Sequence, residues 1–182
     1  MPDTIISIRR AGPEDAARLA EIGARTFRHT FARDNTPEDM AAYLAGAFGP
    51  ALQAAELADA GTTFLIAEAG EEAVGYARLV RGPAPECIPP GSPIEIRRIY
   101  AAEAWLGQGV GAALMRACLA EAGRQQCSVI WLDVWERNER AIAFYRRWGF
   151  TQVGTQAFVL GSDVQRDLLM ARPVLQAAGA EG

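Results

Sequence analysis

The stretch that decides the fold is Trp105-Leu-Gly-Gln-Gly-Val-Gly-Ala112, which lies near the middle of the 182-residue chain. An alternating apolar segment, 94–100, precedes it, and apolar residues at helical spacing follow over 110–123. This order predicts a strand, a glycine turn and a helix. Glycines let the backbone approach a ligand closely, and the unpaired N–H groups of a first helical turn attract negative charge. The loop is typical of a phosphate or pyrophosphate site, but an ordinary turn before a glycine-rich helix start gives the same pattern.

The spacing of the loop excludes two common phosphate-binding motifs. No Gly-Lys-Ser/Thr ending follows it, so it is not the P-loop of nucleoside-triphosphate enzymes. Gly111 follows Gly109 after a single residue, whereas a dinucleotide fingerprint has two residues before its third glycine. A different ligand that carries phosphate is required.

A second motif lies about one strand and one helix further on, and reads Asn138-Glu-Arg-Ala-Ile-Ala-Phe-Tyr-Arg-Arg-Trp-Gly-Phe150. Together the two stretches resemble the Gcn5-related N-acetyltransferase (GNAT) family. Its acetyl-CoA loop has the form Arg/Gln-x-x-Gly-x-Gly/Ala, and its later motif has the form Asn-x-x-Ala-x-x-Phe-Tyr-x-x-x-Gly-Phe. The later motif is matched in full. In the loop, Leu106 stands where the family usually has Arg or Gln, which affects one contact if backbone N–H groups form the cradle.

The resemblance implies an α/β fold of the acyl-CoA N-acyltransferase type, with a mixed central β-sheet flanked by helices. We expect a single domain over 1–174 and a flexible C-terminal tail over 175–182, because the length fits one domain and the last residues are small and polar. The rest of the chain agrees with this fold. Strands are predicted at 5–9, 62–68, 74–80, 94–100, 128–135, 150–153, 158–160 and 167–171, and helices at 15–30, from 35, 50–60, 110–123 and from 138.

The amino-acid composition limits which partners the protein is expected to bind. The net charge of −4 disfavours sequence-independent binding of nucleic acid and permits a cationic substrate. Three cysteines and one histidine show no metal-ligand spacing, so we expect no metal site and a reducing compartment. No apolar run of membrane-spanning length and no export signal is present. The sequence therefore predicts a cytoplasmic protein without a nucleic-acid or membrane partner. It leaves the oligomeric state open, with a homodimer as the candidate.

The resemblance also implies the residues that bind acetyl-CoA, which is the expected co-substrate. Backbone N–H groups of the loop would hold the pyrophosphate, and pantetheine would lie like an extra strand beside a splayed central strand. Asn138 matches a CoA contact and also fits an N-cap, and both roles are compatible. Arg147 either meets the 3′-phosphate or merely suits the helix dipole. The implied positions are Ile99, Tyr100, Ala101, Leu106, Gly107, Gln108, Gly109, Val110, Gly111, Ala112, Asn138 and Arg147.

Two residues are expected to carry the chemistry. Tyr145 matches the family's phenolic proton donor to the CoA sulfur; the alternative is a tyrosine that only packs with Phe144 and Trp148. Glu95 lies where several members place a general base that acts through a water; the alternative is a carboxylate paired with Arg97.

The acceptor is less defined. Local strings such as Thr26-Phe27, Glu95-Ile-Arg-Arg-Ile-Tyr100 and Trp131-Leu-Asp-Val-Trp-Glu136 resemble the PaiA-type branch, whose members acetylate spermidine and spermine. Asp34, Glu38 and Asp39 either shape the acceptor mouth or compensate a helix dipole. We therefore expect direct acetyl transfer, in a ternary complex, to a small primary amine, a polyamine first. The alternatives are acetylation of a protein N-terminus or another small amine, and a non-catalytic CoA-binding regulatory module.

Overall fold

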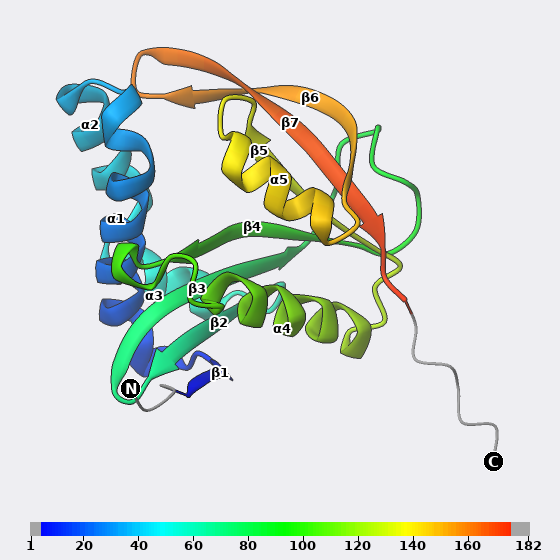
Figure 1. Cartoon of the computed structure of the whole chain (residues 1–182), viewed down its shortest axis with the longest axis horizontal. Coiled ribbons are helices and arrows are strands. Elements are labelled where there is room, and N and C mark those ends of the chain that lie inside the picture. The colour runs from blue at the N-terminus through cyan, green and yellow to red at the C-terminus, as the bar shows by residue number, and fades with distance from the viewer. Residues whose placement is uncertain (1–4, 176–182) are drawn as a thin grey trace.

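The computed structural model describes residues 5–175 and contains one mixed seven-stranded sheet, in the order β1-β2-β3-β4-β5-β7-β6 (Figure 1). The predicted tail lies, apart from Leu175, outside the described residues. Only the β4–β5 pair is parallel. The elements are β1 (Ile6–Arg10), α1 (Ala16–Phe31), α2 (Pro37–Ala47), α3 (Pro50–Ala58), β2 (Thr62–Ala69), β3 (Glu72–Arg81), β4 (Pro93–Ala101), α4 (Val110–Arg124), β5 (Val129–Trp135), α5 (Glu139–Arg147), β6 (Thr151–Leu160) and β7 (Asp163–Pro173), with short 3-10 turns at Pro13–Asp15, Ala32–Asp34 and Glu103–Trp105.

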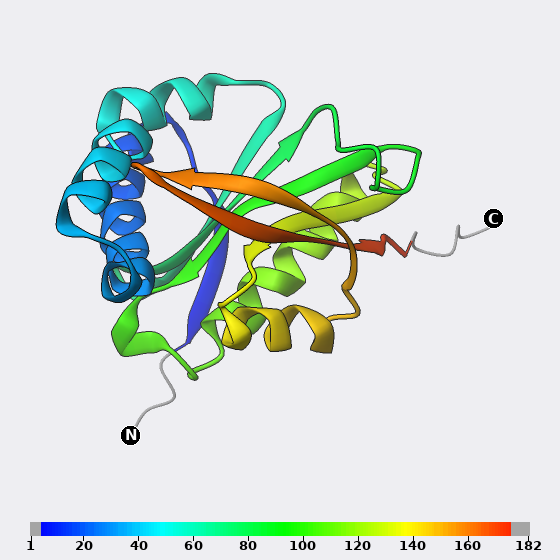
Figure 2. The ribbon, with the colours of Figure 1, turned by 90° about the horizontal axis from the view of Figure 1, so that it is seen from above.

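Helices cover both faces of the sheet (Figure 2). The alternation of strand side chains sends Ile130 and Leu132 of β5 into the main core, which α4 and α5 close. The residues between them, such as Trp131, face the other side. On that other side of the sheet, Leu19 and Ile22 of α1 pack against β2 and β3. The faces therefore differ in which helices cover them. Within the described residues, no helix is long and apolar enough to cross a membrane.

The start of α4 is held close to β3 by a glycine. A Cβ atom on Gly75 would lie 2.7 Å from a methyl carbon of Val110 and 2.8 Å from the carbonyl oxygen of Tyr100. Real Cβ atoms do not approach other atoms so closely, so only glycine fits here without movement. Gly75 therefore lets the first residue of α4, Val110, pack directly on β3.

Strands β4 and β5 separate after a short parallel pairing. Only Pro93–Glu95 pairs with Val129–Trp131. On the β3 side, Arg78 lies opposite Arg98 and Leu79 lies opposite Ile96, which leaves Arg97 as an extra residue in β4. A bulge bends its strand, so β4 turns away from β5 just beyond Glu95. The edge of β4 that faces β5 then has no strand partner and presents free backbone groups, as the splayed strand of the sequence analysis requires.

The helix signals in the sequence are confirmed, and one strand prediction is corrected. Asn138 caps α5 by accepting a hydrogen bond from the N–H of Ala141 at 3.2 Å, and Gly149 follows α5 with φ 85°. The two strands predicted at 150–153 and 158–160 are one strand, β6. The stretch between them lacks apolar alternation because β6 is the edge strand and much of it is exposed.

Candidate active site

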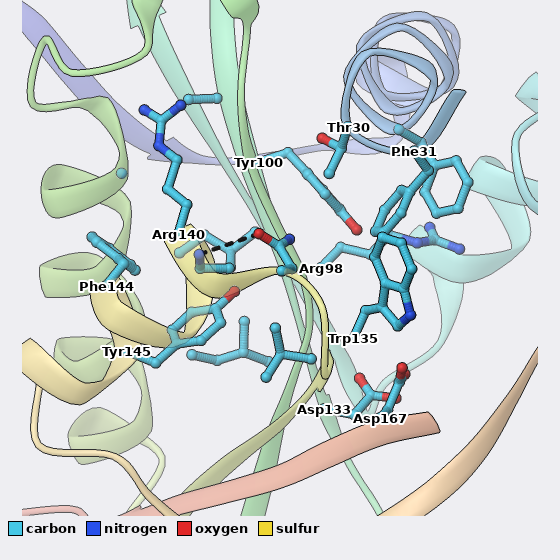
Figure 3. Close-up of a pocket in the computed structure, with 18 of the residues that line it drawn as sticks. Thr30, Phe31, Arg98, Tyr100, Asp133, Trp135, Arg140, Phe144, Tyr145 and Asp167 are labelled. Carbon is cyan, nitrogen blue, oxygen red and sulfur yellow. Dashed lines mark hydrogen bonds between the residues drawn. The ribbon is translucent and has the colours of Figure 1, made fainter. Parts of the chain in front are cut away.

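A cavity of about 1040 Å³ fills the opening between β4 and β5 (Figure 3). On one side it is lined by the glycine loop, the start of α4 and by α5. On the other side it is lined by α1, α2 and the β6–β7 hairpin. The opening therefore connects the two faces of the sheet, and a ligand entering from one face can meet a second ligand from the other.

The glycine loop forms a cradle of free N–H groups. Gly107 and Gly109 have φ of 78° and 87°, in the left-handed region, and a Cβ atom on either would meet nothing within 4 Å. Leu106 and Gln108 already donate their N–H groups within the loop, to the carbonyl oxygens of Glu103 and Trp105. Among the described residues no acceptor is found for the N–H groups of Gly107, Gly109, Val110, Gly111 and Ala112.

These free donors fit the pyrophosphate of CoA, since they open the positive end of α4 to space that no side chain fills. Twelve predicted positions line the cavity, whereas Gln108 and Val110 do not. Gln108 turns its side chain to the carbonyl of Ala104, and Val110 is buried in the main core. The lining positions are Glu95, Ile99, Tyr100, Ala101, Leu106, Gly107, Gly109, Gly111, Ala112, Asn138, Tyr145 and Arg147.

The surroundings of Tyr145 are compatible with both roles considered for it. Its ring packs edgewise on Phe144 and Phe150, with centroids 5.5 and 6.0 Å away. Its hydroxyl makes no hydrogen bond to any described residue and is directed into the cavity (Figure 3). Burial raises the pKa of Tyr145 above its ordinary value. The phenol is therefore protonated at neutral pH and available as a donor.

Asn138 and Arg147 lie on the same side of the cavity as Tyr145. The side-chain oxygen of Asn138 is used in the cap of α5, and its amide nitrogen has no partner among the described residues. Arg147 is exposed and lines the cavity, with its guanidinium 6.0 Å from the ring centre of Phe144. Both side chains are free to meet a ligand from α5.

Glu95 stands where β4 and β5 separate. The residue is 7% exposed, and one of its oxygens, Oε2, accepts a hydrogen bond of 3.0 Å from Nε of Arg97. The ion pair weighed in the sequence analysis is therefore present. Oε1 has no hydrogen-bond partner among the described residues, so one carboxylate oxygen is left for a water or an amine.

On the opposite side of the cavity lie two carboxylates that the sequence analysis did not select, Asp133 on β5 and Asp167 on β7. Burial raises the pKa of Asp133, and burial together with the nearby charge of Asp133 raises the pKa of Asp167 to about 7. The sequence contains a signal for Asp133 alone, because this residue interrupts a strand that is otherwise apolar. Nothing local marks Asp167, since its partner lies on another strand.

The single histidine of the sequence, His29, lines the cavity, whereas two of the three acids named for the acceptor mouth do not. Nδ1 of His29 lies 3.2 Å from a carboxylate oxygen of Glu103, which joins α1 to the segment before the glycine loop. Asp39 accepts a 2.8 Å hydrogen bond from the N–H of Ser162 and so joins α2 to the β6–β7 turn. Asp34 lines the cavity, and Glu38 does not.

This arrangement, in which a phosphate cradle and an unpaired strand edge lead to a buried phenol, is that of an N-acyltransferase that uses an acyl-CoA thioester. The sequence profile of the acetyltransferase (GNAT) family matches residues 20–150, and the chain belongs to this family. It is an acetyl-CoA-dependent N-acetyltransferase.

Relatives and solved structures agree on the family. An uncharacterized N-acetyltransferase of Lactobacillus delbrueckii subsp. lactis is 33% identical over 173 residues, 94% of this chain and 99% of that protein. The N-alpha-acetyltransferase RimI of Mycobacterium tuberculosis is 33% identical over 156 residues, 84% of this chain and 81% of RimI. The PaiA N-acetyltransferase of Thermoplasma acidophilum, solved with coenzyme A, superposes with a TM-score of 0.74 at 18% identity, over 93% of this chain and 99% of that one.

Proposed function

We propose that this enzyme acetylates a primary amine of a small cationic molecule, with the polyamines spermidine and spermine as the first acceptors to test. The observation that carries this is a set of three carboxylates on the side opposite the glycine loop, where Asp34, Asp133 and Asp167 reach the cavity together with Arg33. Carboxylates in a partly enclosed site attract a cation more strongly than they would in open water. The resemblance of local sequence strings to the PaiA-type branch supports the same acceptor class, and the PaiA acetyltransferase shares the fold.

In this proposal, bound acetyl-CoA supplies a reactive thioester, and the chain orients it. The free N–H groups of the glycine loop hold the pyrophosphate, with Asn138 and Arg147 beside them. Pantetheine adds to the free edge of β4 along Ile99, Tyr100 and Ala101, as an extended peptide adds to a sheet edge. Backbone N–H groups of the same edge stabilise the oxyanion that forms on the thioester carbonyl.

Protons move through two side chains. Glu95 takes a proton from the acceptor ammonium through a water, which frees the lone pair of the nitrogen. The nitrogen bonds the acetyl carbon as the carbon–sulfur bond breaks, and Tyr145 gives its hydroxyl proton to the departing sulfur. The nitrogen loses a second proton in this step, which restores the phenol by way of water. An ammonium and acetyl-CoA thus give an amide, CoA as a thiol and one proton.

A protein N-terminus is the second candidate acceptor. The 33% identity to the N-alpha-acetyltransferase RimI favours it, because that relative's name describes acetylation of an α-amine. The third candidate function is that of a regulatory module that binds CoA and catalyses no acetyl transfer. Cytoplasmic location and a homodimer stay predictions of the sequence analysis.

The test is the release of CoA thiol from acetyl-CoA with spermidine, spermine, a neutral-tailed monoamine and an N-terminal peptide. We expect the polyamines to be turned over with the highest kcat/KM, and their KM to rise with salt because charge attraction is screened. Turnover of the peptide with inert polyamines would replace this proposal by the second candidate. Binding of acetyl-CoA without turnover of any amine would support the regulatory module.

A further inference from the structure

Asp133 and Asp167 form a carboxylate pair on the acceptor side of the sheet. In the β5–β7 ladder Asp133 lies opposite Leu169 and Trp135 lies opposite Asp167, so the two acids are diagonal neighbours. Figure 3 shows their carboxylates side by side at the wall of the cavity. Asp133 lies on the same face of β5 as the apolar residues Val129 and Trp131, which stand nearer the start of the strand. A purely structural column of side chains would be apolar here too.

The pair is not neutralised by the protein. Asp167 is 6% exposed, and its Oδ1 atom is buried without a hydrogen-bond partner. Asp133 accepts one hydrogen bond of 2.9 Å, from the neutral amide of Gln156 on β6. With one proton on the pair the two carboxyls can share it, but with both ionised Oδ1 of Asp167 has no donor. A buried carboxylate oxygen without a donor is costly, so folding alone does not explain why Asp167 stands here.

The charged and titratable groups around the pair come from three elements and from the turn after β5. Arg97 on β4 is the cation whose charge acts on Asp133, and it donates its hydrogen bonds to Glu95. Glu136, just after β5, adds a negative charge that acts on Asp167. The phenols of Tyr43 on α2 and Tyr145 on α5 are neutral at physiological pH, since burial raises the pKa of both. The surroundings of the pair therefore do not cancel its charge.

Aromatic rings enclose the same part of the cavity. Phe31 and Trp135 pack with ring centres 6.1 Å apart, and Tyr43 and Phe158 with ring centres 5.7 Å apart, and all four line the cavity. An organic ammonium gains from both features, because carboxylates attract its charge and aromatic faces accept its positive edge and its alkyl stem. An anion or a neutral polar group would gain from neither.

We propose that Asp133 and Asp167 bind a second, non-reacting ammonium group of the acceptor, so that the substrate is a diamine or polyamine. This rests on the proposed function. Glu95 is paired in register with Trp131, at the last β4–β5 contact, where transfer takes place. Asp133 lies two residues further along β5, which is about 7 Å at the rise of a strand. A short alkyl chain therefore connects a nitrogen near Glu95 with a second nitrogen at the pair.

The test compares 1,4-diaminobutane with 4-amino-1-butanol, which differ only in the second ammonium. Kinetics are measured at pH 8 for the wild type, Asp133→Asn, Asp167→Asn and the control Asp163→Asn, an exposed residue of the same strand. We expect the wild type to favour the diamine by at least about tenfold in KM. Asp167→Asn should remove most of this preference by raising the KM of the diamine, with kcat and the KM of the amino alcohol within about twofold. Asp163→Asn should behave as wild type.

Two results would overturn the inference. One is an unchanged preference in Asp133→Asn and Asp167→Asn. The other is an equal loss of kcat with both amines, which would place the pair at the reacting nitrogen. Acetyl-CoA binding and thermal melting show that each variant is folded.

A pH series with the wild type alone tests the same inference. The ratio of the KM of the amino alcohol to the KM of the diamine should rise as pH increases through 7, because Asp167 ionises there. Turnover of neither amine, with acetyl-CoA bound, would instead refute the proposed function.

Discussion

Under the proposed function, the two sides of the opening between β4 and β5 recognise their ligands in different ways. The cofactor side uses backbone N–H groups of one continuous loop, 105–112, and the short helix α5. The acceptor side uses side chains from α1, α2, β5, β6 and β7. A ligand that every member shares can be held by the backbone, which leaves a glycine pattern in the sequence. A variable amine is held by side chains that meet only in the folded protein.

The two sides also differ in how much their polar groups lower the stability of the fold. The free N–H groups of the glycine loop are at the surface of the cavity, where water satisfies them when no ligand is bound. On the acceptor side Asp167 is buried, and its Oδ1 atom lacks a hydrogen-bond partner. Function on the cofactor side is therefore compatible with stability, whereas function on the acceptor side opposes it. Four substitutions test this difference, from the largest expected effect to the smallest.

Gly109→Asp should give the largest effect, because it places a side chain and a negative charge in the open space of the phosphate cradle. We expect acetyl-CoA affinity, measured by calorimetry, to fall by at least about 100-fold, or about 3 kcal/mol. Gly109→Ala separates the causes, since it adds the strain of a side chain at φ 87° without the charge. An affinity of Gly109→Asp equal to wild type would remove the loop from pyrophosphate binding.

Tyr145→Phe should lower kcat by about 100-fold, the lower part of the range for a positioned acid, because thiolate is already a good leaving group. The ring and its contacts with Phe144 and Phe150 are kept, so the loss reports the hydroxyl alone. Acetyl-CoA affinity should hardly change, since the bond to sulfur strengthens as charge develops. If the variant keeps half of the wild-type kcat, with chemistry rate-limiting, Tyr145 serves packing only.

Gly75→Ala should lower stability by about 1–3 kcal/mol and weaken acetyl-CoA binding, because the new Cβ pushes Val110 and the start of α4 away from β3. Gly46→Ala is the control: Gly46 is an exposed residue of α2 where an added Cβ meets nothing within 4 Å, and the substitution should stabilise by about 0.5–1 kcal/mol. Chemical denaturation measures both. Equal effects of the two substitutions would show that close packing of α4 on β3 is not needed.

Asp167→Asn should raise stability at high pH, by about 1–2 kcal/mol at pH 8, because it removes a buried charge. The folded-state pKa of about 7 lies above the value near 3.9 expected in the unfolded chain. The folded protein therefore binds the proton more tightly, and its stability falls as pH rises from about 4 through 7. The advantage of the variant should grow over the same window. Melting curves at pH 5 and pH 8 that show an equal or smaller advantage at pH 8 would contradict the assignment.

Local sequence was sufficient for most of the framework. The cap at Asn138 and the glycine after α5 are short-range features, so their prediction is confirmed. The continuity of β6 was missed because its middle, Gly154-Thr-Gln-Ala157, has no apolar alternation, and only pairing with β7 makes it a strand. The paired acids were missed for a related reason: Asp133 and Asp167 are 34 positions apart and become neighbours only in the β5–β7 ladder.

The sequence by itself determined the family, the use of acetyl-CoA and the expectation that Tyr145 faces the cofactor, because each depends on residues close together along the chain. The tertiary structure decided where β4 parts from β5, through the bulge at Arg97, and which acids line the acceptor side. Those features depend on the register between strands, which sets which side chains share a face. Register is a property of the whole sheet, and no single stretch of the sequence contains it.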